Sequence, residues 1–303
     1  MKLIESKVEL IEQQPGLEGV YKQIELAGRT CYKSEDKITE DSAKGFVDRM
    51  IGSKHGAMLE HGTVYLKGRA VYDETGILEV PKNLFPDFFE RNKYSIVRKI
   101  ESEDMCNWYI TTNLRVIIEN NLTECLEYIC EPTEIHEKRI TARFTCDRGV
   151  SHEIVRHRVM SFAQESTRYC NYGKDKFGNE VTFIKPTWYS IVSDEQKEVF
   201  DDFLSISEEA YMALLDKWEN RTPDKRYKTK FKGNPLTPQQ ARQVLPNALK
   251  TEIVVTGFES DWEHFFSLRS PKYGAQGVHP DMAKLADELY EKLNSVNTDN
   301  KSE

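Results

Sequence analysis

Three consecutive basic residues near the middle of the 303-residue chain, Arg156-His157-Arg158, limit how this segment can fold. The residues before them favour a helix, because Ser151 is a typical N-cap and Glu153 suits the positive end of the helix dipole. An apolar side comes from Val150, Ile154 and Val155. Adjacent helix positions are rotated by about 100°, so the three basic side chains cannot share one solvated face. At least one is expected to point inward or into a cleft, where an arginine needs an anion or a dense set of acceptors.

The segment Gln164–Arg168 follows, and it offers an amide, a carboxylate, two hydroxyls and another guanidinium. Such a set suits a phosphate group and the polar edge of a heterocycle. On chemistry alone, a surface helix with scattered charges stays open as the alternative, because charged residues are mostly exposed in proteins.

The spacing of these residues carries a family resemblance. Arg156-His157-Arg158, seven residues, Ser166 and then Arg168 resemble the signature of flavin-dependent thymidylate synthases, which make thymidylate with FAD. The resemblance implies an α/β fold: a single elaborated domain over residues 1–294, with a mixed or antiparallel sheet flanked by helices. The polar tail at 295–303 is expected to be disordered.

A second matching segment is His55–His61, which resembles the family's His-x-x-x-x-Glu-His segment. In the family this segment lies against the flavin and precedes a core strand, expected here at 63–66. Ala57 stands where the family usually has a serine or threonine, which puts one flavin hydrogen bond in doubt. By spacing alone, His55, Glu60 and His61 do not form a zinc pattern, and we expect no metal.

The C-terminal half matches twice more. Ala241–Pro246 resembles the family's Ala-Arg-x-x-Leu-Pro motif, whose arginine contacts the nucleotide phosphate, and Trp262–Arg269 resembles the last family helix, which ends in Leu-Arg. Phe258-Glu259-Ser260 stands where the family usually has Asn-x-Arg, whose arginine helps to hold FAD. That contact must be replaced or absent.

The stretch from about residue 68 to 138 is far longer than a usual loop of about 4–6 residues, and we interpret it as an insertion before the signature helix. It contains a predicted strand at 107–111, a candidate sheet partner, and a helical run at 114–130 broken near Asn120-Asn121. Elsewhere the pattern predicts strands at 7–11, 143–146, 181–184 and 251–257. It predicts helices at 17–27, from Thr39 to about Gly52, from Ser193 to about Arg221 and from Thr237. A turn is expected at 28–34.

The resemblance implies a role for each matching residue. Arg269, which would hydrogen-bond the uracil edge of dUMP and favour loss of its N3 proton, and Ser166 are the catalytic candidates. The nucleotide would be lined by Glu153, Arg156, Gln164, Glu165, Ser166, Thr167, Arg168, Arg242 and Arg269, with Glu153 standing where the family usually has Gln. FAD would be contacted by His55, Ala57, Glu60, Arg156, His157, Arg158, Gln164, Phe258, Ser260 and His264. For His264 taken alone, an ordinary interface histidine is the alternative.

The implied reaction is the reductive methylation of dUMP to dTMP. Methylenetetrahydrofolate would be the carbon donor, reduced flavin the hydride donor and NADPH the flavin reductant, in a homotetramer with shared active sites. Cys170 is the candidate for a thiol nucleophile, with Arg168 and Lys174 nearby in sequence to lower its pKa. Family members are held to work without such a thiol, so the resemblance makes it unnecessary.

Composition narrows the setting. A net charge of -8 and a pI near 5.6 argue against a general nucleic-acid binder. No apolar run is long enough to span a bilayer, the charged start Met1–Ser6 predicts no secretory signal, and six scattered cysteines without a Cys-x-x-Cys pair suggest reduced thiols. We therefore expect a cytoplasmic protein that binds neither membrane nor nucleic acid.

Three other functions stay open at this point. A catalytically inactive, dUMP-binding regulatory protein would explain the changes at Ala57 and at 258–260. A metal hydrolase would use His55, Glu60, His61 and His152. A nucleic-acid binder would use the basic segment Lys225–Lys232, although the acidic chain makes this the weakest of the three.

Overall fold

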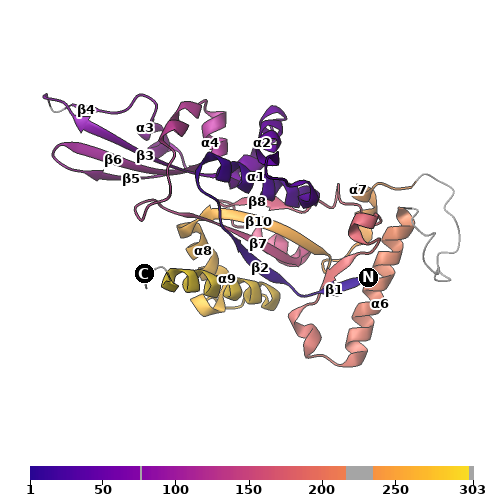
Figure 1. Ribbon diagram of the computed structural model, residues 1–303. Helices are drawn as coiled ribbons and strands as arrows, with labels where there is room; N and C mark the ends of the chain where they lie inside the picture. The colour runs from indigo at the N-terminus through magenta and orange to yellow at the C-terminus, as the bar shows by residue number, and fades with distance from the viewer. Residues whose placement is uncertain (76, 216–234, 300–303) are drawn as a thin grey trace.

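Two antiparallel sheets and one parallel strand pair form the framework of the computed structural model, which describes residues 1–75, 77–215 and 235–299 (Figure 1). The central sheet has the order β2 (Lys7–Ile11), β7 (Arg139–Asp147), β10 (Lys250–Phe258) and β8 (Ser161–Gln164). The second sheet has the order β4 (Leu78–Glu79), β3 (Thr63–Tyr72), β6 (Met105–Asn113) and β5 (Ile96–Glu101). The parallel pair is β1 (Lys2–Ile4) with β9 (Thr182–Ile184). The expected α/β class with a mainly antiparallel sheet is confirmed.

Helices cover both faces of the central sheet (Figure 1). On one face lie α8 (Glu259–Arg269) and α9 (Pro280–Asp299), where Phe144 of β7 stacks on Trp262 with ring centroids 6.3 Å apart. On the other face lies α1 (Gly16–Tyr32), with α2 (Ser42–Gly52) packed against it. The two-residue alternation of β7 and β10 thus supplies a core on each side.

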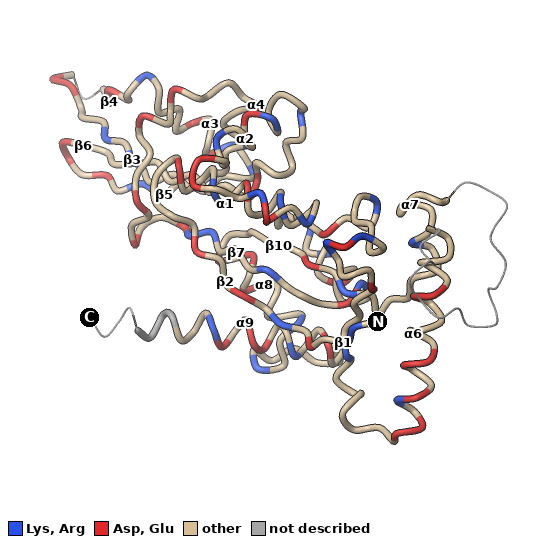
Figure 2. Tube along the Cα trace, turned by 45° about the vertical axis from the view of Figure 1, so that its right-hand side comes forward, with Lys and Arg blue, Asp and Glu red and all other residues tan. Residues whose placement is uncertain are grey.

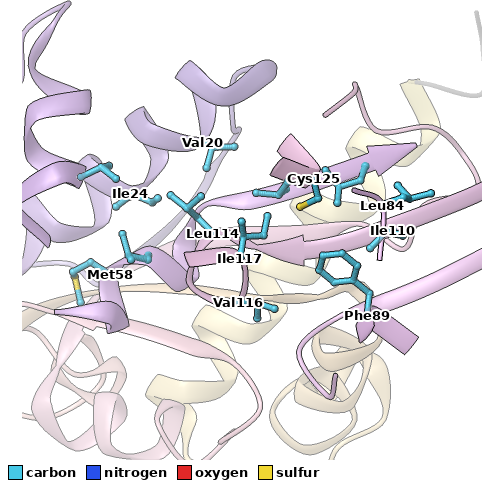
Figure 3. Close-up of a cluster of buried hydrophobic side chains, with 14 of the residues drawn as sticks. Val20, Ile24, Met58, Leu84, Phe89, Ile110, Leu114, Val116, Ile117 and Cys125 are labelled. Atoms are coloured by element: carbon cyan, nitrogen blue, oxygen red, sulfur yellow. The ribbon is translucent and has the colours of Figure 1, made fainter. Parts of the chain in front are cut away.

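The insertion is built onto the second sheet. β3 and β6 pair from Thr63 opposite Asn113 to Val71 opposite Met105, and Gly68 lies opposite Trp108, so the predicted strand at 107–111 is confirmed as a sheet partner. The remaining elements of this region are α3 (Pro86–Arg91) and α4 (Leu114–Glu119), and the predicted break near 120–121 is also found. Leu84, Phe89 and Ile110 from the insertion share one buried cluster with Val20 and Ile24 of α1 (Figure 3).

The end of α1 differs from the expectation. A turn was expected at 28–34, yet the helix continues to Tyr32 and ends at Lys33, which has a φ of 47°. Gly28 is needed for packing, because a Cβ there would come within 2.4 Å of the Phe46 ring on α2. The second helix begins at Ser42 with Asp41, not Thr39, at its N-cap position.

The signature segment also differs. Helix α5 (Arg148–Ile154) is capped by Asp147, whose Oδ1 accepts from the Val150 N–H at 2.9 Å, so Ser151 is not the cap. Because α5 ends at Ile154, Arg156-His157-Arg158 lie in a turn, and the helical placement of these three residues is wrong.

The C-terminal third follows the expected order with shorter helices. α6 (Asp194–Leu214) begins with the Ser193–Gln196 capping box, and most of its charged residues are acidic (Figure 2). Its expected end near Arg221 and the basic segment Lys225–Lys232 lie outside the described residues. α7 (Pro238–Ala241) is a single turn, and α9 extends to Asp299, so residues 295–299 are helical rather than disordered.

Short 3-10 helices complete the described chain at Glu35–Lys37, Gly56–His61, Thr123–Tyr128, Asp175–Phe177, Thr187–Ser190, Arg242–Val244 and Pro271–Tyr273. Within the described ranges no helix is both long enough and apolar enough to cross a membrane.

Candidate active site

The turn after α5 presents two exposed arginines and one buried histidine. Arg156 and Arg158 are exposed, and neither guanidinium makes a hydrogen bond or ion pair with any described residue. His157 between them is buried. The expectation that one of the three points inward is therefore confirmed, and two cations stay available for a ligand.

Arg269 lies at the end of α8 and meets this turn. Its Nη1 forms an ion pair with the Glu153 carboxylate, and its Nε donates to His157 Nε2 at 3.4 Å. The His157 ring also packs on Phe265 (centroids 4.9 Å apart) and on His264 (6.1 Å). Burial, Arg269 and His264 together lower the pKa of His157 to about 4, so its ring is neutral at pH 7. The expected residues Glu153, His157, His264 and Arg269 thus form one group.

A second group forms around the loop after β8. The Ser166 N–H donates to the Cys31 carbonyl at the end of α1, at 2.9 Å. Arg242 Nη1 donates to Thr167 Oγ1 at 2.9 Å, and Arg168 Nε donates to Gln239 Oε1 at 3.1 Å. Arg168 and Arg242, 74 positions apart in the printed sequence, are therefore held at the same loop. Each guanidinium keeps further N–H groups that bind no described residue, as a phosphate site requires.

Gln164 and Glu165 point in different directions. Gln164 Nε2 donates to Ser151 Oγ at 2.9 Å and to Thr251 Oγ1 at 3.2 Å. The Glu165 side chain is buried, and its two oxygens accept from the Tyr172 hydroxyl at 3.0 Å and from Lys250 Nζ at 2.9 Å. The expected contact of Glu165 with a nucleotide stays a prediction, while its carboxylate is already fully occupied within the chain.

A row of alternating charges continues from Glu165, and sequence reasoning missed it. Lys250 also binds Glu252, and Glu252 binds Lys33 at 3.0 Å, beside the end of α1. Burial alone would raise the pKa of Glu252, but the two lysines outweigh it and hold that pKa at about 2. The row ties β10 to α1 next to the Ser166 loop. The alternating Lys250-Thr251-Glu252 of a half-buried strand was its only sequence signal.

The segment His55–His61 forms a 3-10 helix at Gly56–His61 beside α4. Ala57 is half-buried, and the Glu60 carboxylate binds Arg115 Nη1 at 2.5 Å. His61 is fully buried with Nδ1 hydrogen-bonded to Thr256 Oγ1 at 2.9 Å, and burial lowers its pKa to about 3. In the part of the chain that the structure describes, no three His, Cys, Asp or Glu side chains gather as metal ligands would.

Phe258 and Ser260 lie against the start of β7. Phe258 pairs with Arg139 in the sheet, the Arg139 guanidinium lies 5.5 Å from the Phe258 ring centroid, and the Ser260 N–H donates to Glu137 at 3.3 Å. Arg139 Nη1 also donates to the Glu60 carbonyl at 3.0 Å. Arg139 therefore joins the segment around Glu60 to the segment that differs from the family pattern.

Cys170 is not placed as a nucleophile. Its side chain is buried, and burial raises its pKa to about 12. A thiol with that pKa is protonated at neutral pH, so the sulfur lacks the thiolate that attack on a pyrimidine ring needs.

Comparisons with known proteins agree with this chemistry. A family model described as thymidylate synthase complementing protein (Thy1) matches residues 131–297, more than half of the chain. The flavin-dependent thymidylate synthase of Geobacter sulfurreducens is 33% identical over 122 residues, which are 40% of this chain and 43% of that protein. The enzyme of the same name from Mycolicibacterium gilvum is 32% identical over 150 residues, 49% of this chain and 54% of that protein.

The chain spans about half the length of the curated relatives that it matches. Among solved structures, the UMP/dUMP methylase PolB from Streptomyces cacaoi bound with 5-Br dUMP is 17% identical, with 97% of this chain and 93% of that chain covered and a TM-score of 0.41. The family-model match, on the segment that carries the signature turn, Arg242 and Arg269, shows that the chain belongs to the Thy1 family of thymidylate synthase complementing proteins.

Proposed function

We propose that this protein is an FAD-dependent thymidylate synthase that converts dUMP to dTMP. Methylenetetrahydrofolate would supply the carbon and NADPH would reduce the flavin. The observation that carries the proposal is that Arg242 is bonded to Thr167 and Arg168 to Gln239 at the same loop, with N–H groups of both guanidiniums left over. Two guanidiniums held at one loop, one of them bonded to a hydroxyl, suit the phosphate of a nucleotide.

In this proposal Ser166 and Thr167 line the nucleotide beside Arg168. The Cys31 carbonyl fixes the Ser166 backbone at 2.9 Å, so the loop is already shaped before a ligand binds. Arg156 is exposed without a described partner and could reach the same phosphate or sugar. The buried Glu165 and the Gln164 amide support the loop from the sheet below it.

Arg269 would meet the uracil edge and stabilise the ring after loss of its N3 proton. Within this chain its guanidinium is held by the Glu153 carboxylate and by His157. Because the His157 ring is neutral, it can accept a hydrogen bond from Arg269 and does not compete with that guanidinium for the Glu153 carboxylate. Glu153 partly neutralises Arg269, so positioning and charge are set by one ion pair.

The residues present fit a flavin dinucleotide in part. Arg156 and Arg158 are exposed cations without described partners, as a pyrophosphate needs, and the exposed His264 lies beside the buried His157 ring. Reduced FAD supplies a hydride when it is bound. We propose that His55, Ala57, Glu60, Gln164, Phe258 and Ser260 complete its site.

The Arg242 group and the Arg269 group share no hydrogen bond, ion pair or ring contact among the described residues. A bound nucleotide would have to bridge the two groups. The homotetramer with shared active sites is proposed from the family resemblance. The shared core of the insertion and α1 supports one functional unit over residues 1–294.

The first experiment is the visible absorption spectrum of the purified protein, recorded anaerobically before and after dUMP and then NADPH, followed by assay of dTMP with methylenetetrahydrofolate. A flavin spectrum that bleaches with NADPH, together with dTMP formation, supports the proposal. A protein that binds dUMP but takes up no flavin and forms no dTMP overturns it in favour of a nucleotide-binding regulator.

A further inference from the structure

A cavity of about 620 Å³ has none of the candidate site residues in its lining, although Arg139 in its wall contacts two of them, Glu60 and Phe258. It opens between the end of β2, the start of β7 and the insertion segment 129–132. Its walls are mixed: Ile11, Val20, Ile129 and Ile140 give an apolar part, and charged and amide side chains give a polar part. This volume is in the range of pockets that hold small organic ligands. We call it the Arg139 pocket, after the charged residue in its wall.

The frame of the Arg139 pocket is fixed by hydrogen bonds. The Gln13 side chain donates to the Thr63 carbonyl at 2.8 Å and accepts from the Thr63 N–H at 2.8 Å. These two hydrogen bonds join the segment after β2 to the first residue of β3. The backbone N–H of Cys130 donates to the Tyr65 carbonyl at 2.9 Å, which holds the insertion wall on β3. The pocket is therefore formed before any ligand arrives, which lowers the cost of binding.

Arg139 has no ion-pair partner in the described part of the protein. Its Nη1 donates to two neutral acceptors, the Glu60 carbonyl at 3.0 Å and Thr63 Oγ1 at 3.3 Å. Its Nε is buried without an acceptor. Burial lowers the pKa of Arg139 to about 10, which still leaves the guanidinium charged at pH 7.

The nearest carboxylates are engaged elsewhere. The Glu60 carboxylate binds Arg115 at 2.5 Å, and an Asp261 oxygen accepts from the Phe258 N–H at 2.9 Å. No described carboxylate lies within ion-pair distance of Arg139. An enclosed guanidinium of this kind gains much from an added anion, because neutral acceptors compensate its lost hydration only in part.

We propose that the Arg139 pocket binds an organic anion, with the acidic group at Arg139 and an apolar body along Ile11, Val20 and Ile129. The exposed Lys138 at the rim adds a second positive charge, against one exposed carboxylate from Glu12. The insertion supplies a whole wall of this pocket through 129–132, so ligand binding is a use for the insertion. Arg139 also contacts Glu60 and Phe258, which we propose to hold FAD, so displacement of the bound anion by FAD would assign it to the flavin site instead.

The test uses two probes that differ only in charge. 8-Anilinonaphthalene-1-sulfonate carries a sulfonate on an apolar body, and N-phenyl-1-naphthylamine is the same body without it. Fluorescence titration of the full chain is expected to show saturable binding of the sulfonate probe. Arg139→Met is expected to lower the affinity for the sulfonate probe by about tenfold or more, the range of a lost charge-assisted hydrogen bond. The affinity for the neutral probe should fall by less than about twofold.

Arg143→Met is the matched control, because Arg143 lies on the same strand and the same face but is paired with Glu9 at 3.2 Å. It should leave both probes unchanged. Cys130→Trp keeps Arg139 but fills the cavity, so it should abolish binding of both probes even if Arg139→Met does not fold. Equal sulfonate binding by Arg139→Met and the parent chain overturns the proposal, as does full displacement of the probe by dUMP or unchanged binding in Cys130→Trp.

Discussion

The carboxylate of Glu153 on α5 holds the guanidinium of Arg269 at the end of α8, and the same guanidinium donates to the buried ring of His157. Two helices from distant parts of the chain thereby fix the side chain that we propose to act on the uracil ring. The pKa of the His157 ring therefore depends in part on the charge of Arg269.

Replacement of Arg269 by Gln should raise the pKa of His157. Burial is the main cause of its low value of about 4, and the positive charge of Arg269 is the next. Burial and His264 remain in the variant, so the new pKa should still lie below the ordinary value of about 6.5. Titration of the His157 ring protons by NMR checks this, with Lys272→Gln, which removes a nearby surface cation paired with Glu291, as the control. An unchanged pKa in Arg269→Gln would show that the coupling is absent.

Cys170→Ala should keep thymidylate formation within about twofold, since the buried thiol is protonated at neutral pH. Stability should fall modestly, by about 1 kcal/mol, as for a typical buried substitution. Arg269→Ala serves as the contrast and should lose about a hundredfold or more in kcat, the cost of one transition-state donor. Complete loss of activity in Cys170→Ala with FAD still bound would sink the proposed flavin chemistry.

Lys250→Met should destabilise the fold by about 3–5 kcal/mol, because it leaves the buried Glu165 carboxylate without its cation. The double variant Lys250→Met/Glu165→Gln should recover part of that loss by removing the stranded charge. Urea unfolding monitored by circular dichroism gives both values. Lys44→Met breaks an exposed pair with Asp48 and should leave the unfolding midpoint almost unchanged. A double variant as unstable as the single one would contradict the assigned role of Glu165.

The free energy of unfolding should decrease as the pH falls below about 6.5. His61 is buried and has a folded pKa of about 3, whereas an unfolded histidine titrates near 6.5. Between these values the unfolded chain binds a proton that the folded chain does not, which costs up to about 1.4 kcal/mol per pH unit. Between pH 6 and 4, His61→Gln should lower the slope of the unfolding free energy against pH by up to about 1.4 kcal/mol per pH unit, the contribution of one proton. If the slope is identical in the variant, His61 does not contribute to it.

The sequence predicted elements best where local signals decide them. The strand at 7–11 and the start of α6 at the Ser193–Gln196 box agree with the structure because alternation and capping are local. The predicted end of α1 was wrong because glycine, here Gly28, is common just after the end of a helix. Here it admits the Phe46 ring from another helix, and such packing cannot be seen in the sequence around Gly28.

The candidate site shows the same division. The resemblance placed Arg168, Arg242, Glu153 and Arg269 in one nucleotide site. The structure holds Arg168 and Arg242 at one loop and pairs Glu153 with Arg269, and the roles of all four stay predictions. The tie between Lys250 and Glu165 joins residues 85 positions apart and has no motif. The charge of Arg139 could not be assigned a use either, since its lack of a carboxylate partner is a property of the folded environment.

The pairing of β3 with β6 suggests a way in which the insertion at about 68–138 could have grown. Pairing begins at Thr63 opposite Asn113, next to the 3-10 helix at Gly56–His61, and runs outward to Val71 opposite Met105. Two paired antiparallel strands can lengthen or shorten by two residues each at their outer end while every side chain nearer the base keeps its face. Evolution could thus enlarge the outer part step by step without moving the reaction centre, and an engineer could trim or extend the same end for the same reason.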